Sequence, residues 1–191
     1  VCSSDLIIAL DFGRHERAMQ LTEKAISVEP NNADIHALHG GACQGLRQWV
    51  RALASYEKAI ALDVNTAAIY KNRGTCLIAL ERADEAIRNY ESAIRAWPDD
   101  PDFHTVLGSV LHTQRRINEA EASFRRAIAL DPLNAKIQFK LGVLLRGDNR
   151  WFEAEVCFRE TIKLNPQHVA AHAMLGSLLQ MQGRLAESER S

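Results

Sequence analysis

The residues of this sequence best suited to chemistry are a cysteine and two histidines near residue 40. His39 and Cys43 stand four positions apart, a spacing that places two side chains on one face of a helix. A thiol beside an imidazole is the arrangement of a nucleophilic cysteine and its base. His36 and His39 are three positions apart and form a weak metal pair, but no carboxylate or cysteine completes it, so we predict no metal site.

Two other motifs resemble parts of functional sites. The HGGA motif at residues 39–42 is similar to the HGGG loop of esterases, but no G-x-S-x-G nucleophile elbow follows it. The acidic run DDPD at residues 99–102 is explained by turn formation and helix capping. Because phosphate-binding loops, dinucleotide fingerprints and catalytic triads are also missing from the sequence, we predict no catalytic residue, no cofactor and no enzyme activity.

Composition and charge narrow the classes of partner. Hydrophobic residues make up 47% of the sequence and charged residues 25%, which is typical of a folded protein rather than a disordered one. The formal net charge is −1 and the pI is about 6.7, so no strong field favours nucleic acid or an anionic membrane. Since the sequence also has no apolar run of membrane-spanning length, we predict neither nucleic acid nor a membrane as partner.

The cysteines indicate the cellular location, and the first six residues raise the question of whether the whole chain is native. Cys2, Cys43, Cys76 and Cys157 show no CxxC pair and no metal-ligand spacing, and no N-x-Ser/Thr site occurs, so we predict a cytoplasmic location. Residues 1–6, VCSSDL, match the translation of a common sequencing-adapter end. We therefore predict that these six residues are not native and exclude them from fold reasoning.

A period of 34 residues runs through the rest of the chain. Four series of residues keep this step, and Val64 stands at the one missing position of the proline series. The series are Gly40, Gly74, Gly108, Gly142 and Gly176; Ala52, Ala86, Ala120 and Ala154; Tyr56, Tyr90, Phe124 and Phe158; and Pro30, Pro98, Pro132 and Pro166. Several series in one register indicate an array of repeats.

The series resemble the tetratricopeptide repeat family, whose signature is W-x2-L-G-x2-Y…A-x3-F…P over 34 residues. The best unit, 101–134, carries His104, Leu107, Gly108, Leu111, Ala120, Phe124, Ala127 and Pro132 at the signature positions. The resemblance covers a partial repeat 7–32, full repeats 33–66, 67–100, 101–134 and 135–168, and a partial repeat 169–191. It implies an all-α, right-handed α-solenoid of tandem helix-turn-helix tetratricopeptide repeats.

The amphipathic pattern agrees with helix pairs. Segments 103–115 and 118–130 have apolar residues at spacings of three and four, and Pro132 ends the second. A glycine inside a helix costs about 1 kcal/mol relative to alanine. The glycine series therefore predicts that the two helices of a repeat approach closely at that residue.

The resemblance also gives the cysteine and histidines a structural interpretation. Cys43 occupies a position that the family usually fills with Tyr or Leu, which favours a buried thiol over a nucleophile. His36, His104 and His172 stand at the fourth position of their units, and we expect them to replace the packing aromatic residue found there.

In this family the first helix of each repeat lines a concave groove that binds extended peptides or helices, so the resemblance implies a protein-interaction scaffold. The groove residues that it implies here are Lys71, Asn72, Thr75, Ser109, His112, Lys136, Phe139, Lys140 and Arg146. Some members clamp a C-terminal carboxylate with Lys, Asn, Asn, Lys and Arg. Here lysines fill the three basic positions, but Thr75 and Val106 replace the two asparagines. A looser basic groove for acidic peptides therefore fits better than this clamp, and the other interpretation is that these lysines are simply solvated.

Two alternatives stay open. The array could be the substrate-recognition arm of a larger O-GlcNAc transferase-like or sulfotransferase enzyme whose catalytic domain is absent, although only Asn72 matches the asparagine series of such arms. A third hypothesis is self-association through uncapped ends of the array, because repeat arrays need capping for solubility.

Overall fold

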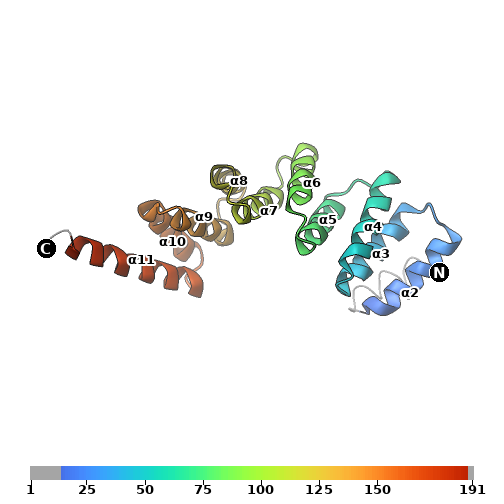
Figure 1. Ribbon diagram of the computed structural model, residues 1–191, viewed down its shortest axis with the longest axis horizontal. Helices are drawn as coiled ribbons and strands as arrows, with labels where there is room; N and C mark the ends of the chain where they lie inside the picture. Colours follow the sequence, from blue (N-terminus) through green and yellow to red (C-terminus); the bar gives the residue numbers. More distant parts are fainter. Residues whose placement is uncertain (1–13, 189–191) are drawn as a thin grey trace. The chain divides into compact units, whose positions relative to one another are not determined.

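The computed structural model describes residues 14–188, so the predicted non-native residues 1–6 and residues 7–13 lie outside the described part. The described residues form ten helices and no strands (Figure 1). The helices are α2 (His15–Val28), α3 (Ala33–Gly45), α4 (Trp49–Ala61), α5 (Ala67–Ala79), α6 (Ala83–Ala96), α7 (Pro101–Thr113), α8 (Ile117–Leu130), α9 (Ala135–Gly147), α10 (Trp151–Leu164) and α11 (Val169–Ser188).

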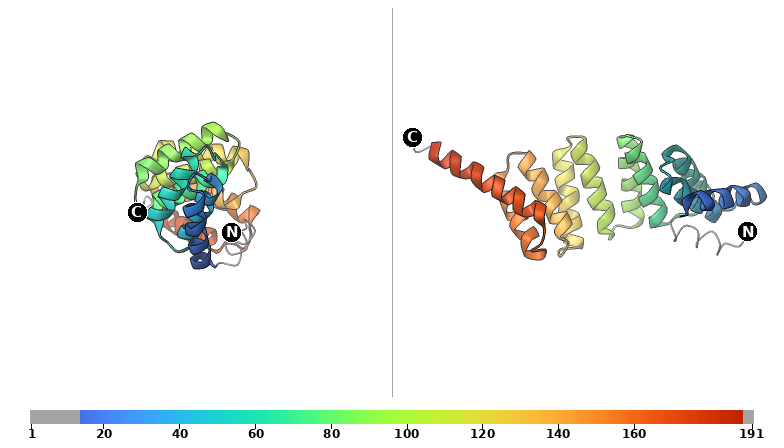
Figure 2. Two further views of the ribbon diagram at one scale, coloured as in Figure 1. Left: turned by 90° about the vertical axis from the view of Figure 1, so that its right-hand side faces the viewer. Right: turned by 90° about the horizontal axis from the view of Figure 1, so that it is seen from below.

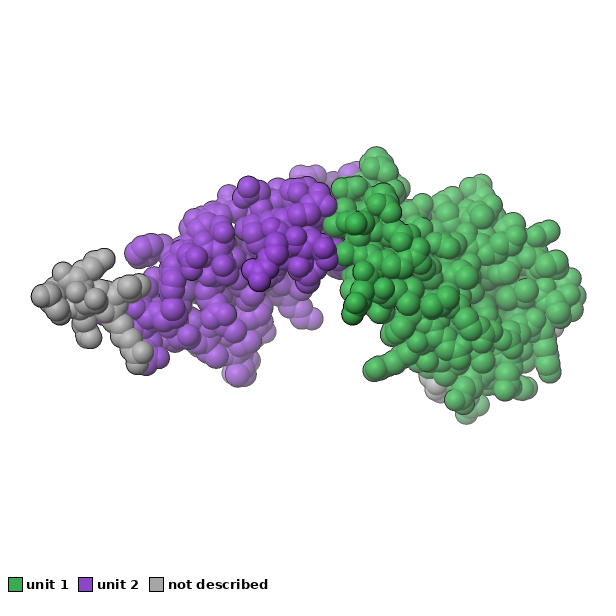
Figure 3. Space-filling model, viewed as in Figure 1, with its two compact units in different colours: residues 1–97 green, residues 98–191 purple. Residues whose placement is uncertain are grey.

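The chain divides into two compact units, residues 1–97 and residues 98–191 (Figure 3). The first unit contains α2 to α6 and the second contains α7 to α11. Within each unit, helices that follow one another in the chain pack side by side (Figure 2).

Each full repeat predicted from the sequence contains one pair of helices, which we call helix A and helix B. The A helices are α3, α5, α7 and α9, and the B helices are α4, α6, α8 and α10. Three residues join A to B in every pair, and a connection this short makes the two helices antiparallel neighbours. Helix α2 is the B helix of the partial repeat 7–32, because Ala18 and Ala25 align with Ala52 and Ala59.

The helix starts follow from capping. Asn32, Thr66, Asp100 and Asn134 precede the four A helices, and the side chain of each accepts a hydrogen bond from a backbone N–H in the first turn. Helix α7 begins at Pro101, two residues before the predicted segment 103–115, because proline is well suited to the first helical position and Asp100 caps it. It ends at Thr113, two residues before the predicted end.

The four A helices end in the same type of turn. Arg47, Glu81, Arg115 and Asn149 have φ values of 56°, 59°, 61° and 60°, which is the left-handed region. The next residue in each turn donates its N–H to a carbonyl five residues earlier, as Arg82 does to Leu77 at 2.9 Å. This is a Schellman motif, which satisfies carbonyls that the helix end leaves without partners.

The B helices end before the proline series. Pro98, Pro132 and Pro166 each lie two residues after the last residue of α6, α8 or α10, where they prevent the helix from continuing. Helix α4, which is followed by Val64 instead, ends through Asp63 at a φ of 72°. The missing proline is therefore replaced by a second left-handed helix stop.

The glycine and aromatic series meet inside each full repeat. A Cβ atom on Gly40 would lie 2.7 Å from Cε1 of Tyr56, and one on Gly108 would lie 2.9 Å from Cδ1 of Phe124. The same relation joins Gly74 to Tyr90 and Gly142 to Phe158, always sixteen residues later in the chain. The alanines four positions before these aromatic residues, Ala52, Ala86, Ala120 and Ala154, are fully buried.

The last glycine of the series differs. A Cβ on Gly176 would meet nothing within 4 Å. Helix α11 continues to Ser188 through the positions that form the A–B turn elsewhere, so within the described residues it packs on the preceding α10 but on no B helix of its own repeat. As a result Leu179 is 41% exposed, although its equivalents Leu77, Leu111 and Leu145 are buried.

Candidate functional site

The A helices of the second unit carry a cluster of polar side chains. The Lys140 ammonium on α9 donates a hydrogen bond to Ser109 Oγ on α7 at 3.1 Å. Ser109 in turn donates to the backbone carbonyl of Thr105 at 2.9 Å. The lysine is thus held between two neighbouring A helices, with its remaining N–H donors available to other groups.

His112 belongs to the same cluster. It lies three residues after Ser109 on α7, so the two side chains share one face of the helix. Burial lowers the pKa of His112, and the charges of Arg115 and Lys140 lower it further. The imidazole is therefore mainly neutral at pH 7 and can donate one hydrogen bond and accept another.

Three further predicted groove residues lie on α9. Lys136 is exposed and stands one helical turn before Lys140, on the same face. Arg146 is half-buried in the last turn. Phe139 packs sideways instead: its ring centroid lies 5.8 Å from that of Phe158 and 4.7 Å from that of the His168 ring.

The predicted groove residues of the first unit lie on α5. Thr75 donates to the backbone carbonyl of Lys71 at 2.9 Å. Asn72 is half-buried on the same helix. The Tyr56 hydroxyl on α4 donates a hydrogen bond to Gln44 Oε1 on α3 at 2.9 Å, and Thr75 lies close enough to the Tyr90 hydroxyl to act on its pKa. Burial raises the pKa of both tyrosines, that of Tyr90 to about 12. In this unit the tyrosines of the B helices reach polar groups of helix A, whereas the second unit has Phe124 and Phe158 at those positions.

The histidines at the fourth repeat position have a polar role that the sequence interpretation missed. The Nε2 atoms of His36, His104 and His172 lie 2.9, 3.3 and 2.9 Å from the carbonyl oxygens of Pro30, Pro98 and Pro166. A carbonyl only accepts, so each ring donates. These histidines tie the start of helix A to the turn before it. Histidine recurs six residues after proline in the sequence, but this spacing alone does not show that the ring reaches the proline carbonyl.

Cys43 and His39 do contact one another, but as a buried neutral pair. Thr22 donates to the carbonyl of Ala18 at 2.8 Å and accepts from His39 Nδ1 at 2.8 Å. His39 Nε2 is then the acceptor for the Cys43 thiol, 3.4 Å away. Burial lowers the pKa of His39 and raises that of Cys43. The thiol therefore stays protonated at neutral pH, in agreement with the predicted buried thiol.

The described part of the chain holds neither a metal cluster nor a membrane-spanning helix. Among these residues no group of three or more His, Cys, Asp or Glu side chains could hold a metal ion. No helix within residues 14–188 is long and apolar enough to cross a membrane.

The repeat pattern also matches a family profile. The profile described as Tetratricopeptide repeat matches four overlapping ranges, 44–101, 72–135, 105–155 and 139–190. Together these ranges cover most of the chain. The chain belongs to the tetratricopeptide repeat family. The predicted fold class, an all-α array of helix-turn-helix tetratricopeptide repeats, is thereby confirmed.

Solved tetratricopeptide repeat structures share this fold. YrrB, described as a TPR protein with an unusual peptide-binding site, is 21% identical, with a TM-score of 0.78 over 88% of each chain. MamA from Desulfovibrio magneticus RS-1 is 20% identical, with a TM-score of 0.81 over 86% of this chain and 93% of that one. The C-terminal part of a repeat protein from Cytophaga hutchinsonii is 15% identical, with a TM-score of 0.86 over 95% and 71%. Comparison with curated protein sequences finds no significant match.

Proposed function

We propose that this tetratricopeptide repeat chain is a non-enzymatic scaffold that binds a peptide or helix of another protein along its A helices. The observation that carries the proposal is the cluster of Ser109, His112 and Lys140, with Lys136 one turn away on the same face of α9. These side chains come from two consecutive repeats and offer several hydrogen-bond donors on the face that helix A presents in this family.

The chemistry of the cluster favours an acidic partner. A carboxylate can accept charge-assisted hydrogen bonds from the ammonium groups of Lys136 and Lys140, which are stronger than neutral ones. Ser109 and the neutral ring of His112 add uncharged hydrogen-bonding groups beside them. Because Lys140 already has a partner at Ser109, part of its conformational entropy is lost before any ligand binds.

The comparisons support an interaction module in general terms only. YrrB is described as having a peptide-binding site, and its 21% identity to this chain reflects a common fold. The acidic preference rests on the residues of α7 and α9 in this chain.

A charge-reversal experiment tests the proposal. We expect the double variant Lys136→Glu/Lys140→Glu to bind a fluorescent Asp- and Glu-rich peptide at least about tenfold more weakly than the wild type, since two like charges now face the ligand. Fluorescence anisotropy gives the affinity, and circular dichroism checks that helicity is unchanged.

Two controls separate the site from net charge. Lys58→Glu/Lys163→Glu makes the same charge change on exposed lysines of the B helices α4 and α10, and we expect it to bind as the wild type does. The same peptide with Asn and Gln in place of Asp and Glu should bind poorly to all three proteins. Equal peptide binding by the wild type and the Lys136/Lys140 variant would rule out this groove assignment.

The alternative of a transferase recognition arm has weaker support. Such arms carry a series of asparagines at the position of Asn72, but the equivalent residues in the next two repeats are Val106 and Lys140. We therefore prefer the scaffold, and a cytoplasmic location stays a prediction.

A further inference from the structure

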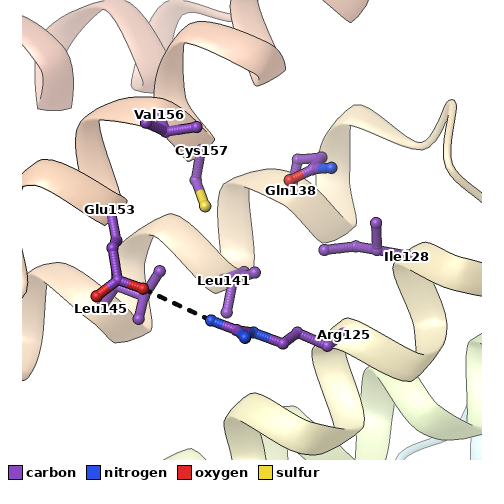
Figure 4. Close-up of a pocket in the computed structure, with 8 residues that line it drawn as sticks. All are labelled: Arg125, Ile128, Gln138, Leu141, Leu145, Glu153, Val156 and Cys157. Atoms are coloured by element: carbon purple, nitrogen blue, oxygen red, sulfur yellow. Dashed lines mark ion pairs between the residues drawn. The ribbon is translucent and has the colours of Figure 1, made fainter.

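A pocket of about 320 Å³ lies between α8 and α10, with α9 forming its base (Figure 4). Apolar side chains dominate its lining. The lining residues are Arg125, Ile128, Gln138, Leu141, Leu145, Glu153, Val156 and Cys157. The pocket is separate from the proposed peptide site, because Gln138, Leu141 and Leu145 lie on the side of α9 opposite Lys136 and Lys140.

The repeat at 67–100 shows what this pocket lacks. There the residue equivalent to Leu141 is Arg73, which reaches from α5 to both neighbouring B helices. Its guanidinium donates to Asn89 Oδ1 on α6 at 3.1 Å and to Glu57 Oε1 on α4 at 3.4 Å. Arg73 thus occupies the space between two B helices that is open in the second unit.

The equivalents of these partners explain the opening. Cys157 stands where the first unit has Asn89, and Arg125 stands where it has Glu57. With the shorter, uncharged Leu141 between them, the space that Arg73 fills is left apolar and accessible.

Exposed apolar side chains lie beside the pocket. Phe152 and Val156, one helical turn apart on α10, are 80% and 67% exposed, and Val156 also lines the pocket. The residues equivalent to Phe152 in the two preceding repeats are Asn118 and Asp84, as expected for a surface position. An exposed phenylalanine next to an open apolar pocket marks a contact surface.

The charges around the pocket compensate one another. Arg150 donates to Glu121 at 2.5 and 2.9 Å and forms an ion pair with Glu153 at 2.6 Å. Arg125 pairs with the same two carboxylates, at 2.6 Å to Glu121. Its ion pair with Glu153, at 3.6 Å, is the one drawn in Figure 4. Two arginines and two glutamates leave this rim without net charge, so a surface of the same composition is not repelled.

We propose that this surface binds a second copy of the chain about a two-fold axis, with Phe152 of each copy entering the pocket of the other. A single surface that carries both the protruding aromatic residue and the cavity is self-complementary, which is the requirement for an isologous dimer. Its aromatic centre and charged rim match the usual composition of protein interfaces. The dimer leaves Lys136 and Lys140 free for a peptide and is independent of the proposed function.

Sedimentation velocity of the full 191-residue chain over a range of concentrations tests the dimer. The variant Phe152→Asn copies the residue at Asn118 and should raise the dimer dissociation constant by about tenfold or more. The triple variant Arg125→Glu/Leu141→Arg/Cys157→Asn copies Glu57, Arg73 and Asn89, and should weaken the dimer as strongly by filling the pocket.

A control and a mixing experiment complete the test. Val50→Asn changes the equivalent exposed residue on α4 and should leave the dimer intact. Mixing the Phe152 variant with the filled-pocket variant should restore partial association, because one intact Phe152 then meets one intact pocket. A wild type that stays monomeric overturns the proposal, as does association unaffected by Phe152→Asn, which assigns it to the ends of the array or to the peptide site.

Discussion

At the scale of single residues, the glycine series shows how far sequence reasoning extends. The period predicts a close approach at Gly40, Gly74, Gly108 and Gly142, and the structure supplies the partner, an aromatic ring sixteen residues later. Gly176 could not be distinguished by sequence period alone, because the difference depends on whether a second helix packs there.

The repeat pattern also did not predict the hydrogen bonds that the histidines form. His36 and His104 are at positions where the family has a packing aromatic residue, but each donates to a proline carbonyl. Hydrogen-bond geometry between a helix and the preceding turn is set by backbone dihedral angles, which residue spacing does not reveal.

The buried His39 gives a prediction about pH. Burial and the charge of Arg51 keep its pKa in the folded chain below 6.5, so the unfolded chain binds a proton first as pH falls. The free energy of unfolding should therefore decrease as pH drops below 6.5 toward the folded-state pKa. The variant His39→Gln should lose this part of the decrease.

Urea unfolding at about pH 7.5 and about pH 5.5 measures the effect. Because burial also lowers the pKa of His104 and His112, the informative quantity is the difference between the wild type and His39→Gln. The same loss of stability in both proteins would contradict a buried neutral His39.

At the scale of helices, the elements were easier to predict than their ends. The spacing of apolar residues predicts two helices in each repeat, and the structure has a pair in each full repeat. Helix α7 is shifted by two residues from the predicted segment at both ends, because Asp100 and Pro101 start it and Arg115 stops it in the left-handed region. Arginine gives no sequence signal for such a stop, since glycine is the usual residue.

These helix stops predict a stabilising substitution. Glu81 has a φ of 59°, a conformation that costs a residue with a Cβ roughly 1–2 kcal/mol. Replacing Glu81 with glycine removes this cost, but part of the gain in stability is lost because glycine increases the conformational entropy of the unfolded chain. Glu81→Gly should therefore raise the free energy of unfolding by roughly 0.5–1 kcal/mol.

The control is a glycine within a helix. Asp84→Gly, in the first turn of α6, should instead lower the free energy of unfolding by up to about 1 kcal/mol. Thermal melts of the two variants and the wild type would show the opposite signs, and a lower melting temperature for Glu81→Gly would argue against a strained turn.

At the scale of the whole molecule, stability in a repeat array comes from contacts inside a repeat and with its neighbours. The substitutions Gly74→Ala and Gly142→Ala each force a methyl group against a buried ring, Tyr90 or Phe158. Overpacking of this kind costs about 1–3 kcal/mol. We expect each substitution to destabilise mainly the repeat that contains it.

Hydrogen exchange measured by mass spectrometry checks this expectation. Gly74→Ala should accelerate amide exchange most in α5 and α6, and Gly142→Ala most in α9 and α10. Each variant serves as the control for the other. Equal acceleration in all helices by both variants would indicate one cooperative unit instead of locally stabilised repeats.

The two proposed contact surfaces differ in how far the sequence alone predicts them. Family resemblance places Lys136 and Lys140 on helix A, while their link to Ser109 and His112 requires the packing of α7 against α9. No sequence motif predicts the pocket over Leu141, because the pocket forms only where α8, α9 and α10 meet. Comparing Leu141 with Arg73 in the sequence could have indicated a difference between the repeats, but not an open space.

The seventh position of the repeat has a consequence for how such a chain can be changed. It holds His39 in a buried hydrogen-bonded pair, Arg73 in a bridge between two helices, and Leu141 beneath an open pocket. The glycine, alanine and aromatic series recur around all three. New binding properties can therefore arise here by point substitution alone, without insertion or deletion, and residues from one repeat can be transplanted into another as interchangeable modules.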